Sequence, residues 1–129
     1  MAIKKQLTVC MGNKPGSLAK LCRTLGKAKI NITAISVADH KDAGVIRIVT
    51  DTAAKASSAI KKLGYPVVMS DVVVVELPHE PGTLAEAAGK LAKEGINIEF
   101  VYGTAHKGCE TPTIVFAVND VKKAADILG

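Results

Sequence analysis

Two short segments of the chain carry residue types that could hold an anion. Each places a proline and a glycine directly before an apolar pattern with helical spacing, at Pro15-Gly16-Ser17 and at Pro81-Gly82-Thr83. The first N–H groups of a helix are unpaired and lie at the positive end of the helix dipole, so they bind anions without a charged side chain. A glycine at this turn lets a ligand reach the backbone, because it has no Cβ. One copy would be equally typical of a plain strand-to-helix turn, whereas two copies favour a pair of binding loops.

The side chains that usually perform catalysis do not form a recognisable set. His40, His79 and His106 have no adjacent serine, cysteine or carboxylate arrangement that would support a nucleophile. An acylphosphatase-type site needs an arginine in a basic loop, but Arg23 falls within a predicted helix and Arg47 within a predicted strand. We therefore expect no enzyme activity, no metal site and no cofactor. We expect His40 and His106 to be exposed loop residues.

The three cysteines, Cys10, Cys22 and Cys109, are odd in number and widely spaced, with no C-x-x-C pair. This spacing argues against a zinc site, a copper-chaperone site, a redox motif and a disulfide framework. Cys10 falls in a predicted strand and Cys22 on the apolar side of a predicted helix, so we expect them to be small core residues in a protein of the reducing cytoplasm. No apolar run approaches the roughly 18 residues of a membrane span, and no secretory signal is expected.

The formal net charge of +5 is unevenly divided along the chain. Residues 1–71 carry twelve Lys/Arg and four Asp/Glu, a net of +8, whereas residues 72–129 carry five Lys and eight Asp/Glu, a net of −3. A nucleic-acid binder is usually basic throughout, and an RNA-binding sheet needs aromatic residues that the central predicted strands lack, so we expect no nucleic-acid partner. Lys20, Arg23 and Lys27 form either a solvated helix face or a surface that docks on an acidic half, in this chain or a neighbour.

The sequence contains an internal duplication with an offset of 66 residues. Nine of the twenty-one positions from 15 to 35 are identical to their partners, and Ile30-Asn31-Ile32 matches Ile96-Asn97-Ile98. Farther along, the pattern aligns Asp51 with Asp120, a shift of three residues that an insertion at a hairpin tip explains. We therefore expect two repeats, residues 1–71 and residues 72–129.

Each repeat has the pattern of a strand, a helix, two strands and a second helix. Leu7, Val9 and Met11 alternate as in a half-buried strand, and Val72 to Val75 form a β-branched run suited to burial on both faces. Ser17 or Thr83 should cap the first helix of each repeat. The remaining expected features are second strands at 30–39 and 96–105, third strands at 44–51 and 113–120, a fourth strand at 65–69, caps at Asp51 and Asp120, and helix ends at Gly64 and Gly129.

This order predicts an α+β protein made of two tandem ferredoxin-like units. In such a unit both helices cover one face of an antiparallel sheet. The second repeat has no segment for its last strand, which would expose the edge of residues 72–77. We therefore expect at least a dimer, in which each sheet edge is covered. The alternative is that the two repeats pair within one chain, which would join their sheets but would not obviously supply the missing strand.

The two Pro-Gly-[Ser/Thr]-Leu-Ala segments, each followed fourteen residues later by Ile-Asn-Ile, resemble the ACT domain, a small ligand-sensing module of enzymes in amino-acid metabolism. The resemblance covers nearly the whole chain, once per repeat. It implies an amino acid bound between two ACT units, with its carboxylate at the loop before the first helix and with polar contacts from an asparagine of the neighbouring unit. The residues implied for the first site are Asn13, Gly16, Ser17, Leu18 and Asn97, and those for the second are His79, Gly82, Thr83, Leu84 and Asn31.

His79 replaces the amide-bearing Asn13, so the resemblance does not imply equal affinity at the two sites. It implies allosteric regulation of a separate metabolic enzyme, since the sequence shows no catalytic domain. The alternative is a protein-interaction module or regulatory subunit without its own ligand. Either asparagine could instead be only a left-handed residue or a turn residue.

Overall fold

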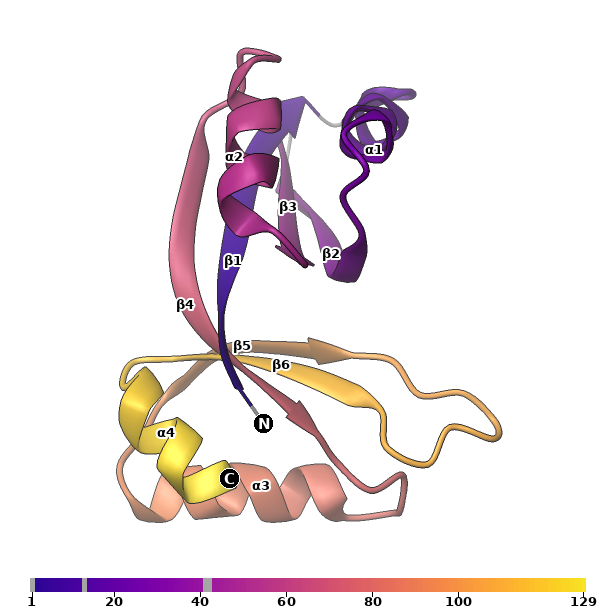
Figure 1. Ribbon diagram of the computed structural model, residues 1–129. Helices are drawn as coiled ribbons and strands as arrows, with labels where there is room; N and C mark the ends of the chain where they lie inside the picture. Colours follow the sequence, from indigo (N-terminus) through magenta and orange to yellow (C-terminus); the bar gives the residue numbers. More distant parts are fainter. Residues whose placement is uncertain (1, 13, 41–42) are drawn as a thin grey trace. The chain divides into compact units, whose positions relative to one another are not determined.

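The computed structural model describes residues 2–12, 14–40 and 43–129 (Figure 1). Within these residues the chain alternates strands and helices in the order expected for a duplicated β-α-β-β-α pattern. The elements are β1 (Ala2–Gly12), α1 (Ser17–Lys27), β2 (Ile32–His40), β3 (Ala43–Thr50), α2 (Ala53–Lys61), β4 (Val67–Glu76), α3 (Thr83–Lys93), β5 (Ile98–Gly103), β6 (Thr113–Val118) and α4 (Val121–Leu128).

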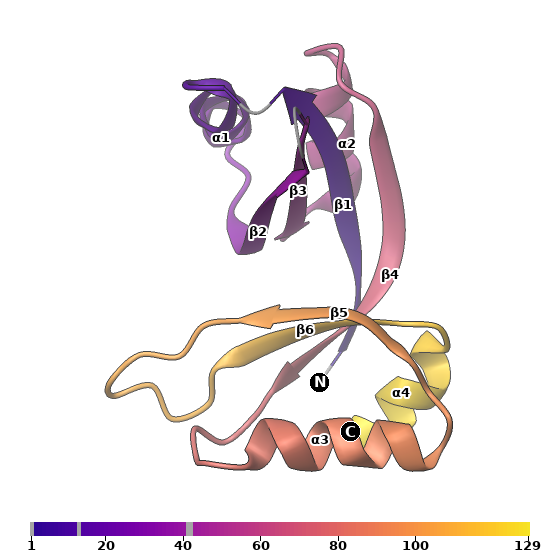
Figure 2. The same ribbon diagram turned by 180° about the vertical axis from the view of Figure 1, so that it is seen from behind.

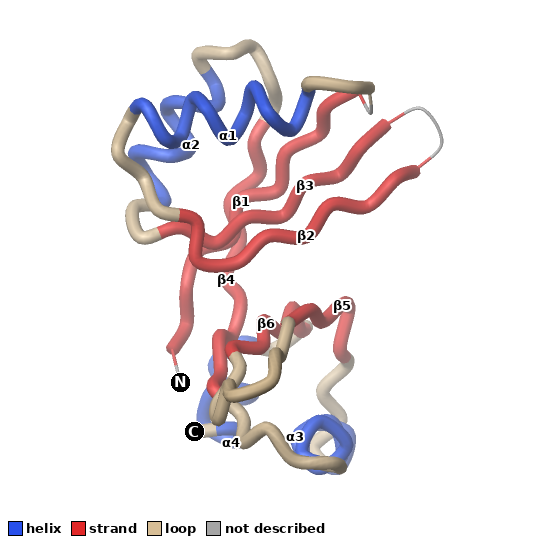
Figure 3. Tube along the Cα trace, turned by 90° about the vertical axis from the view of Figure 1, so that its right-hand side faces the viewer, coloured by secondary structure: helices blue, strands red, loops and turns tan. Residues whose placement is uncertain are grey.

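The chain forms two compact units. The first unit is Lys5–Ser70, and the second unit consists of Met1–Lys4 and Asp71–Gly129. In the first unit the strand order is β2-β3-β1-β4, and α1 and α2 lie on one face of the sheet (Figure 3). In the second unit the order is β1-β4-β6-β5, and α3 and α4 lie on one face of β5 and β6 (Figure 2). Both units are thus ferredoxin-like, as the sequence predicts.

The core of the first unit lies between its helices and sheet. Leu7 pairs with Ile48 and Val9 with Ile46 across antiparallel strands, so these side chains share the face that the helices cover. Each of the four is at most 3% exposed, which confirms the predicted alternation in the first strand. The cluster also contains Met11, Leu21, Leu25, Ile30, Ala56 and Ile60.

The second unit repeats this arrangement with its own cluster. Val73 and Val75 pair with Phe116 and Ile114 and face the helices. The predicted burial of the β-branched run holds for Val72, Val73 and Val75, which are at most 3% exposed, whereas Val74 is only partly buried. The cluster also contains Ala87, Leu91, Ile96, Val118, Ala124 and Ala125.

The segments predicted as a fourth strand and as the opening strand of the second repeat are one continuous strand, β4. Ser70 and Asp71 lie within it, and neither a glycine nor a proline interrupts the chain between Val67 and Glu76. The first part of β4 belongs to the first unit and the second part to the second unit. The repeat boundary at residue 71 stays a prediction about the duplicated sequence.

The second unit obtains its outer strand from the beginning of the chain. Residues 2–4 of β1 group with it, and β1 is the neighbour of β4 in the sheet. The expectation that residues 72–77 have an open edge is therefore wrong, because β1 is long enough at eleven residues to serve both units. At the end opposite to the shared strands β1 and β4, the first unit ends with β2 and the second unit with β5.

The register of the strands corrects the alignment of the repeats. Ile32 pairs with Thr50, and its counterpart Ile98 pairs with Val118, so the offset rises from 66 to 68 residues. The inserted loop is therefore longer by two residues and not by three. Thr52 and Asp120 then occupy equivalent positions as N-caps of α2 and α4.

Capping follows this corrected register. Asp120 caps α4 as predicted, because its side chain accepts a hydrogen bond from the Lys123 N–H. Asp51 does not cap α2, since the N-cap is Thr52 and no side-chain cap bond forms.

Candidate functional site

The two Pro-Gly loops have the same backbone conformation. Gly16 and Gly82 are the N-cap residues of α1 and α3, with φ of 92° and 91°. This left-handed region is open to glycine and disfavoured for other residues, which explains the glycine in both repeats. In each loop the next N–H closes a turn, from Ser17 to the Lys14 carbonyl (3.2 Å) and from Thr83 to the Glu80 carbonyl (3.3 Å).

The prediction that Ser17 or Thr83 caps its helix is wrong. No side-chain cap bond forms at α1 or α3, because the cap position is taken by the glycine one residue earlier. The Thr83 hydroxyl instead donates to the carbonyls of Pro78 (2.8 Å) and Glu80 (3.0 Å), so it closes its own loop.

The absence of a side-chain cap leaves backbone donors at both helix starts. Among the described residues, no acceptor pairs with the N–H of Leu18 or of Leu84. These side chains are 40% and 47% exposed, so solvent reaches both helix starts. An anion can therefore be held by backbone N–H groups and the helix dipole at either loop.

The two predicted asparagines open the second strand of each repeat. The Asn31 N–H donates to Asp51 Oδ1 (3.3 Å), and the Asn97 N–H donates to Asn119 Oδ1 (3.0 Å). Each asparagine carbonyl accepts a bond from the same partner's N–H at 3.3 Å. Both backbones are thus fixed, and both residues are exposed.

One part of the alternative for the two asparagines, that either adopts the left-handed conformation, is wrong. Among the described non-glycine residues, only Lys29 has a positive φ, of 61°. Gly95, its counterpart in the second repeat, has a φ of 72°. The left-handed turn therefore lies two residues before each asparagine.

Within one unit, the loop and the asparagine lie at opposite ends of the sheet. Gly12 pairs with Ala43 near the loop, whereas Ile32, next to Asn31, pairs with Thr50 at the other end of β3. The seven residues between Ala43 and Thr50 correspond to about 20 Å of strand. A single unit therefore does not join its own loop to its own asparagine.

A hollow of about 150 Å³ lies beside the first loop, between α1 and the neighbouring strands. Its apolar walls come from β1, β2 and β3, so three strands meet at the loop. Besides the predicted Gly16, Ser17 and Leu18, it is lined by Met11, Gly12, Lys14, Val37, Gly44 and Ile46. The sequence analysis did not name the strand residues as site residues, although their alternation places them on the helix face.

The second loop has different surroundings. Gly103 occupies the position of Val37, and a Cβ at Gly103 would collide with the Ile114 side chain. The Ile114 side chain therefore lies where a side chain at position 103 would begin, which explains the glycine there. The cavity next to Thr83, about 160 Å³, lies instead toward α4 and is bordered by Leu128. The two repeats thus share a loop conformation, but different side chains surround the two loops.

The remaining predicted residues have simple positions. Asn13 lies outside the described residues. His79 is exposed, and its N–H donates to the Glu110 carbonyl at 2.8 Å. His40 and His106 are exposed, as expected, although His40 is the last residue of β2 and not a loop residue. Where the chain is described, no three His, Cys, Asp or Glu residues gather as a metal site.

The cysteines are free, and Cys10 is exposed while Cys22 and Cys109 are partly buried. The prediction of a core position for Cys10 is wrong, because Val9 and Met11 face the helices and Cys10 points to the opposite side of the strand. In the described part of the chain, no helix is long and apolar enough to cross a membrane.

Comparison with known proteins agrees with this architecture. Residues 1–128 match the sequence model of a family described as an ACT domain pair. No curated protein sequence matches the chain. Among solved structures, the chain is similar to protein BT0572 from Bacteroides thetaiotaomicron, with 32% identity, a TM-score of 0.90 and coverage of 98% of this chain and 86% of that chain.

More distant structures share the fold. The regulatory subunit of aspartate kinase from Thermus thermophilus, in its ligand-free form, has 16% identity and a TM-score of 0.73, with 98% of this chain and 95% of that chain covered. The corresponding subunit from Thermus flavus has 19% identity and a TM-score of 0.68, with 98% and 90% covered. The chain belongs to the ACT domain family, as a pair of ACT domains.

Proposed function

We propose that this protein is a non-catalytic sensor that binds a free amino acid and regulates a separate enzyme of amino-acid metabolism. The observation that carries the proposal is the duplicated loop, in which a left-handed glycine leaves backbone N–H groups open at the start of α1 and of α3. A carboxylate is the part of an amino acid that such a site recognises. The regulatory subunits of aspartate kinase have the same fold, which is consistent with this role.

In the proposed complex the loop of one repeat and the asparagine of the other hold the same ligand. The N–H groups near Leu18 bind the carboxylate, and the side chains of Asn13 and Asn97 bind polar groups of the ligand. The amino-acid side chain enters the hollow between Leu18, Val37 and Ile46. At the second loop, His79, Gly82, Thr83, Leu84 and Asn31 form the corresponding site.

The two sites should differ in affinity. Beside the first loop Val37 lines a hollow of about 150 Å³, whereas the corresponding position beside the second loop is Gly103, which the Ile114 side chain covers. A ligand therefore meets different apolar walls at the two sites. We propose that the first site is the tighter one, that the protein is a homodimer and that it acts in the cytoplasm.

A specific observation favours the alternative, an interaction module without a ligand. Both outer strands expose apolar side chains, Ile35 and Val37 on β2 and Val101 on β5, each at least 40% exposed. Such edges usually pair with another chain. A module of this kind would leave the loops empty.

A binding screen decides between the two functions. Each of the twenty amino acids is added to the protein, and thermal unfolding and titration calorimetry are recorded, because a ligand of the folded state raises stability by mass action. We expect one or a few amino acids to bind without turnover. Binding of none at millimolar concentration would favour the interaction module, and any turnover would contradict the non-enzyme proposal.

Two matched variants locate the site. Val37→Trp fills the hollow beside the first loop and should weaken binding about tenfold or more, since the ligand side chain loses its place. Val68→Trp adds the same bulk at an exposed position of β4, 64% exposed and outside the hollow, and should leave affinity unchanged. If the two variants weakened binding equally, the hollow would not be part of the binding site.

A further inference from the structure

The helical layer of the first unit is basic and has no carboxylate. Residues 14–29, which include α1, carry five cations and no Asp or Glu: Lys14, Lys20, Arg23, Lys27 and Lys29. Residues 52–70, which include α2, carry Lys55, Lys61 and Lys62 and again no Asp or Glu. Both helices lie on the same face of the sheet (Figure 3), so the eight cations all belong to the helical layer of the first unit and its adjoining loops.

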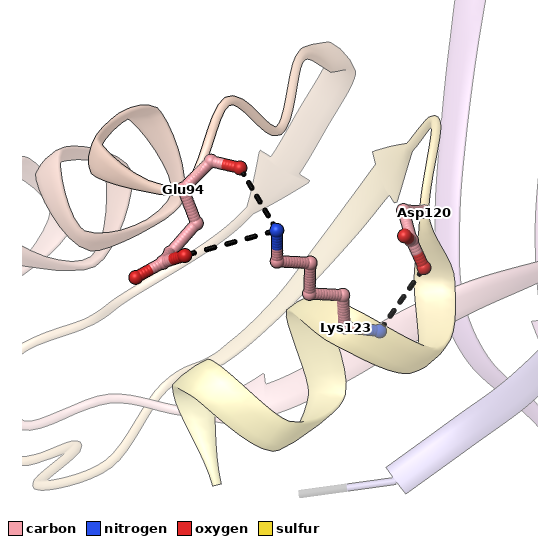
Figure 4. A network of polar contacts seen from close by, with 3 residues as sticks. All are labelled: Glu94, Asp120 and Lys123. Carbon is pink, nitrogen blue, oxygen red and sulfur yellow. Dashed lines mark hydrogen bonds and ion pairs between the residues drawn. The ribbon is translucent and has the colours of Figure 1, made fainter.

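In the helical layer of the second unit, lysines are paired with glutamates of the same layer. Lys90 and Glu86 form an ion pair on α3 at 3.6 Å. Lys123 of α4 reaches Glu94 at the end of α3, with 3.7 Å to the carboxylate and 3.2 Å to the carbonyl (Figure 4). The duplicated scaffold therefore does not require a basic helical layer, and the excess of cations is a property of the first repeat.

Two hollows follow α1 along this basic surface. The larger, about 420 Å³, lies between α1 and α2, with Lys27, Lys55 and Lys62 exposed at its rim. Its half-buried floor is apolar and formed by Ala28, Ala59 and Leu63. This rim and floor define the lysine groove.

The smaller hollow, about 280 Å³, lies at the start of α1 and includes Lys14, Lys20, Arg23 and Tyr65. Lys20 Nζ lies 6.0 Å from the centre of the Tyr65 ring, which orients one of these cations. The cationic rim thus continues from the lysine groove to the first loop.

We propose that the lysine groove docks an acidic, amphipathic helical segment of a separate protein. A segment with carboxylates on one side and apolar residues on the other matches both the lysine rim and the apolar floor. This inference rests on the proposed regulatory function, in which the protein must contact the enzyme that it regulates. Its test uses no amino acid, so the two proposals can fail separately.

The charges and residue types favour this occupant over two others. A second copy is poorly suited, because its acidic repeat has a net charge of only −3 and the eight cations would remain in excess. A nucleic acid is poorly suited because seven of the eight cations are lysines, whereas arginine forks and aromatic platforms dominate nucleic-acid recognition. Lysine can pair with carboxylates across a hydrated interface, because its ammonium group is a compact, strongly hydrated point charge.

The test uses fluorescence anisotropy with a labelled helical peptide that carries glutamates on one side and leucines on the other. We expect salt-sensitive binding, because exposed charges are screened within about 10 Å at ordinary ionic strength. A polyglutamate peptide of equal charge should bind about tenfold more weakly, since it cannot use the apolar floor. Equal binding of both peptides, or no binding of the amphipathic peptide at low salt, would overturn the proposal.

Matched charge reversals place the binding site. Lys27→Glu combined with Lys55→Glu should weaken peptide binding at least tenfold. The control, Lys93→Glu combined with Lys122→Glu, makes the same change of net charge on exposed positions of the second unit and should weaken it less than about twofold. An equal loss of peptide affinity in the control would show that only the net charge matters, and would overturn the proposal that the lysine groove is the binding site.

Two further measurements test the competing occupants. If a short DNA duplex bound more tightly than the amphipathic peptide, and if this binding were lost in the Lys27/Lys55 variant, the occupant of the lysine groove would be a nucleic acid and not an acidic protein. Self-association that disappears only in this variant, measured by sedimentation, would make a second copy the occupant. We expect neither result.

Discussion

The loop glycines are needed for the backbone conformation of the two loops. Gly16 and Gly82 have φ near +90°, and a Cβ built on either would meet no atom within 4 Å. We therefore expect Gly16→Ala or Gly82→Ala to lower the free energy of unfolding by about 1 kcal/mol, because an L-residue is strained in the left-handed region and gains no contact there. Urea unfolding of each variant measures this change.

Gly89 provides the matched control, since it lies within α3 and also has open space around its Cβ position. Gly89→Ala should raise the free energy of unfolding by about 0.5–1 kcal/mol, because alanine is the better helix former. A change of the same sign at Gly16 and Gly89 would contradict the conformational explanation.

At this scale the sequence predicted the loops but not their capping. The repeated glycine indicated a special turn, and the turn exists twice. The hydroxyl residues were expected to cap because Ser and Thr are usual N-caps, but the left-handed glycine moves the cap position one residue back. Met11, Val37 and Ile46, which line the hollow, were not predicted as site residues. They come from three different strands and are brought together only by the register of the sheet.

At the scale of elements, the two longest strands depart most from the predicted pattern. The sequence indicated a strand at 65–69 and another from Val72, and the structure joins them in β4. Apolar alternation locates strands but does not mark where one ends when no glycine or proline intervenes. The outer strand of the second unit was unpredictable from its own repeat, because it comes from residues 2–4, far away in sequence.

This use of β1 makes the second unit sensitive to the beginning of the chain. We expect deletion of residues 1–4 to reduce protection from hydrogen exchange at the amides of Val72 to Val75, because β4 loses its neighbour in that unit. Amides of β3, which belong to the first unit and pair with β1 from Gln6 onward, should keep their protection. Equal protection of β4 with and without these residues would contradict the assignment of β1 as its outer strand.

For the whole molecule, the comparison of its two units shows what duplication has kept and what has diverged. Both keep the left-handed glycine, the paired asparagine backbone and a separate apolar cluster. They differ in the charge of the helices and in the space beside the loop. Fold and loops were predictable because they depend on periodic patterns, whereas the hollow depends on individual side chains from three strands.

The last prediction concerns assembly, because the strand order leaves β2 and β5 as the outer strands. Edge strands with exposed apolar side chains invite pairing, and Ile35 on β2 is 40% exposed. We expect a dimer in which these edges are covered, so Ile35→Lys should shift the sedimentation equilibrium toward the monomer, since a lysine on an edge opposes pairing. Val68→Lys, at a 64% exposed position of β4 on the opposite edge of the first unit's sheet from β2, should leave a dimer formed through β2 intact. A wild-type monomer at micromolar concentration would refute the dimer. A dimer that resists Ile35→Lys would require another contact surface, since the β2 edge could then contribute little to association.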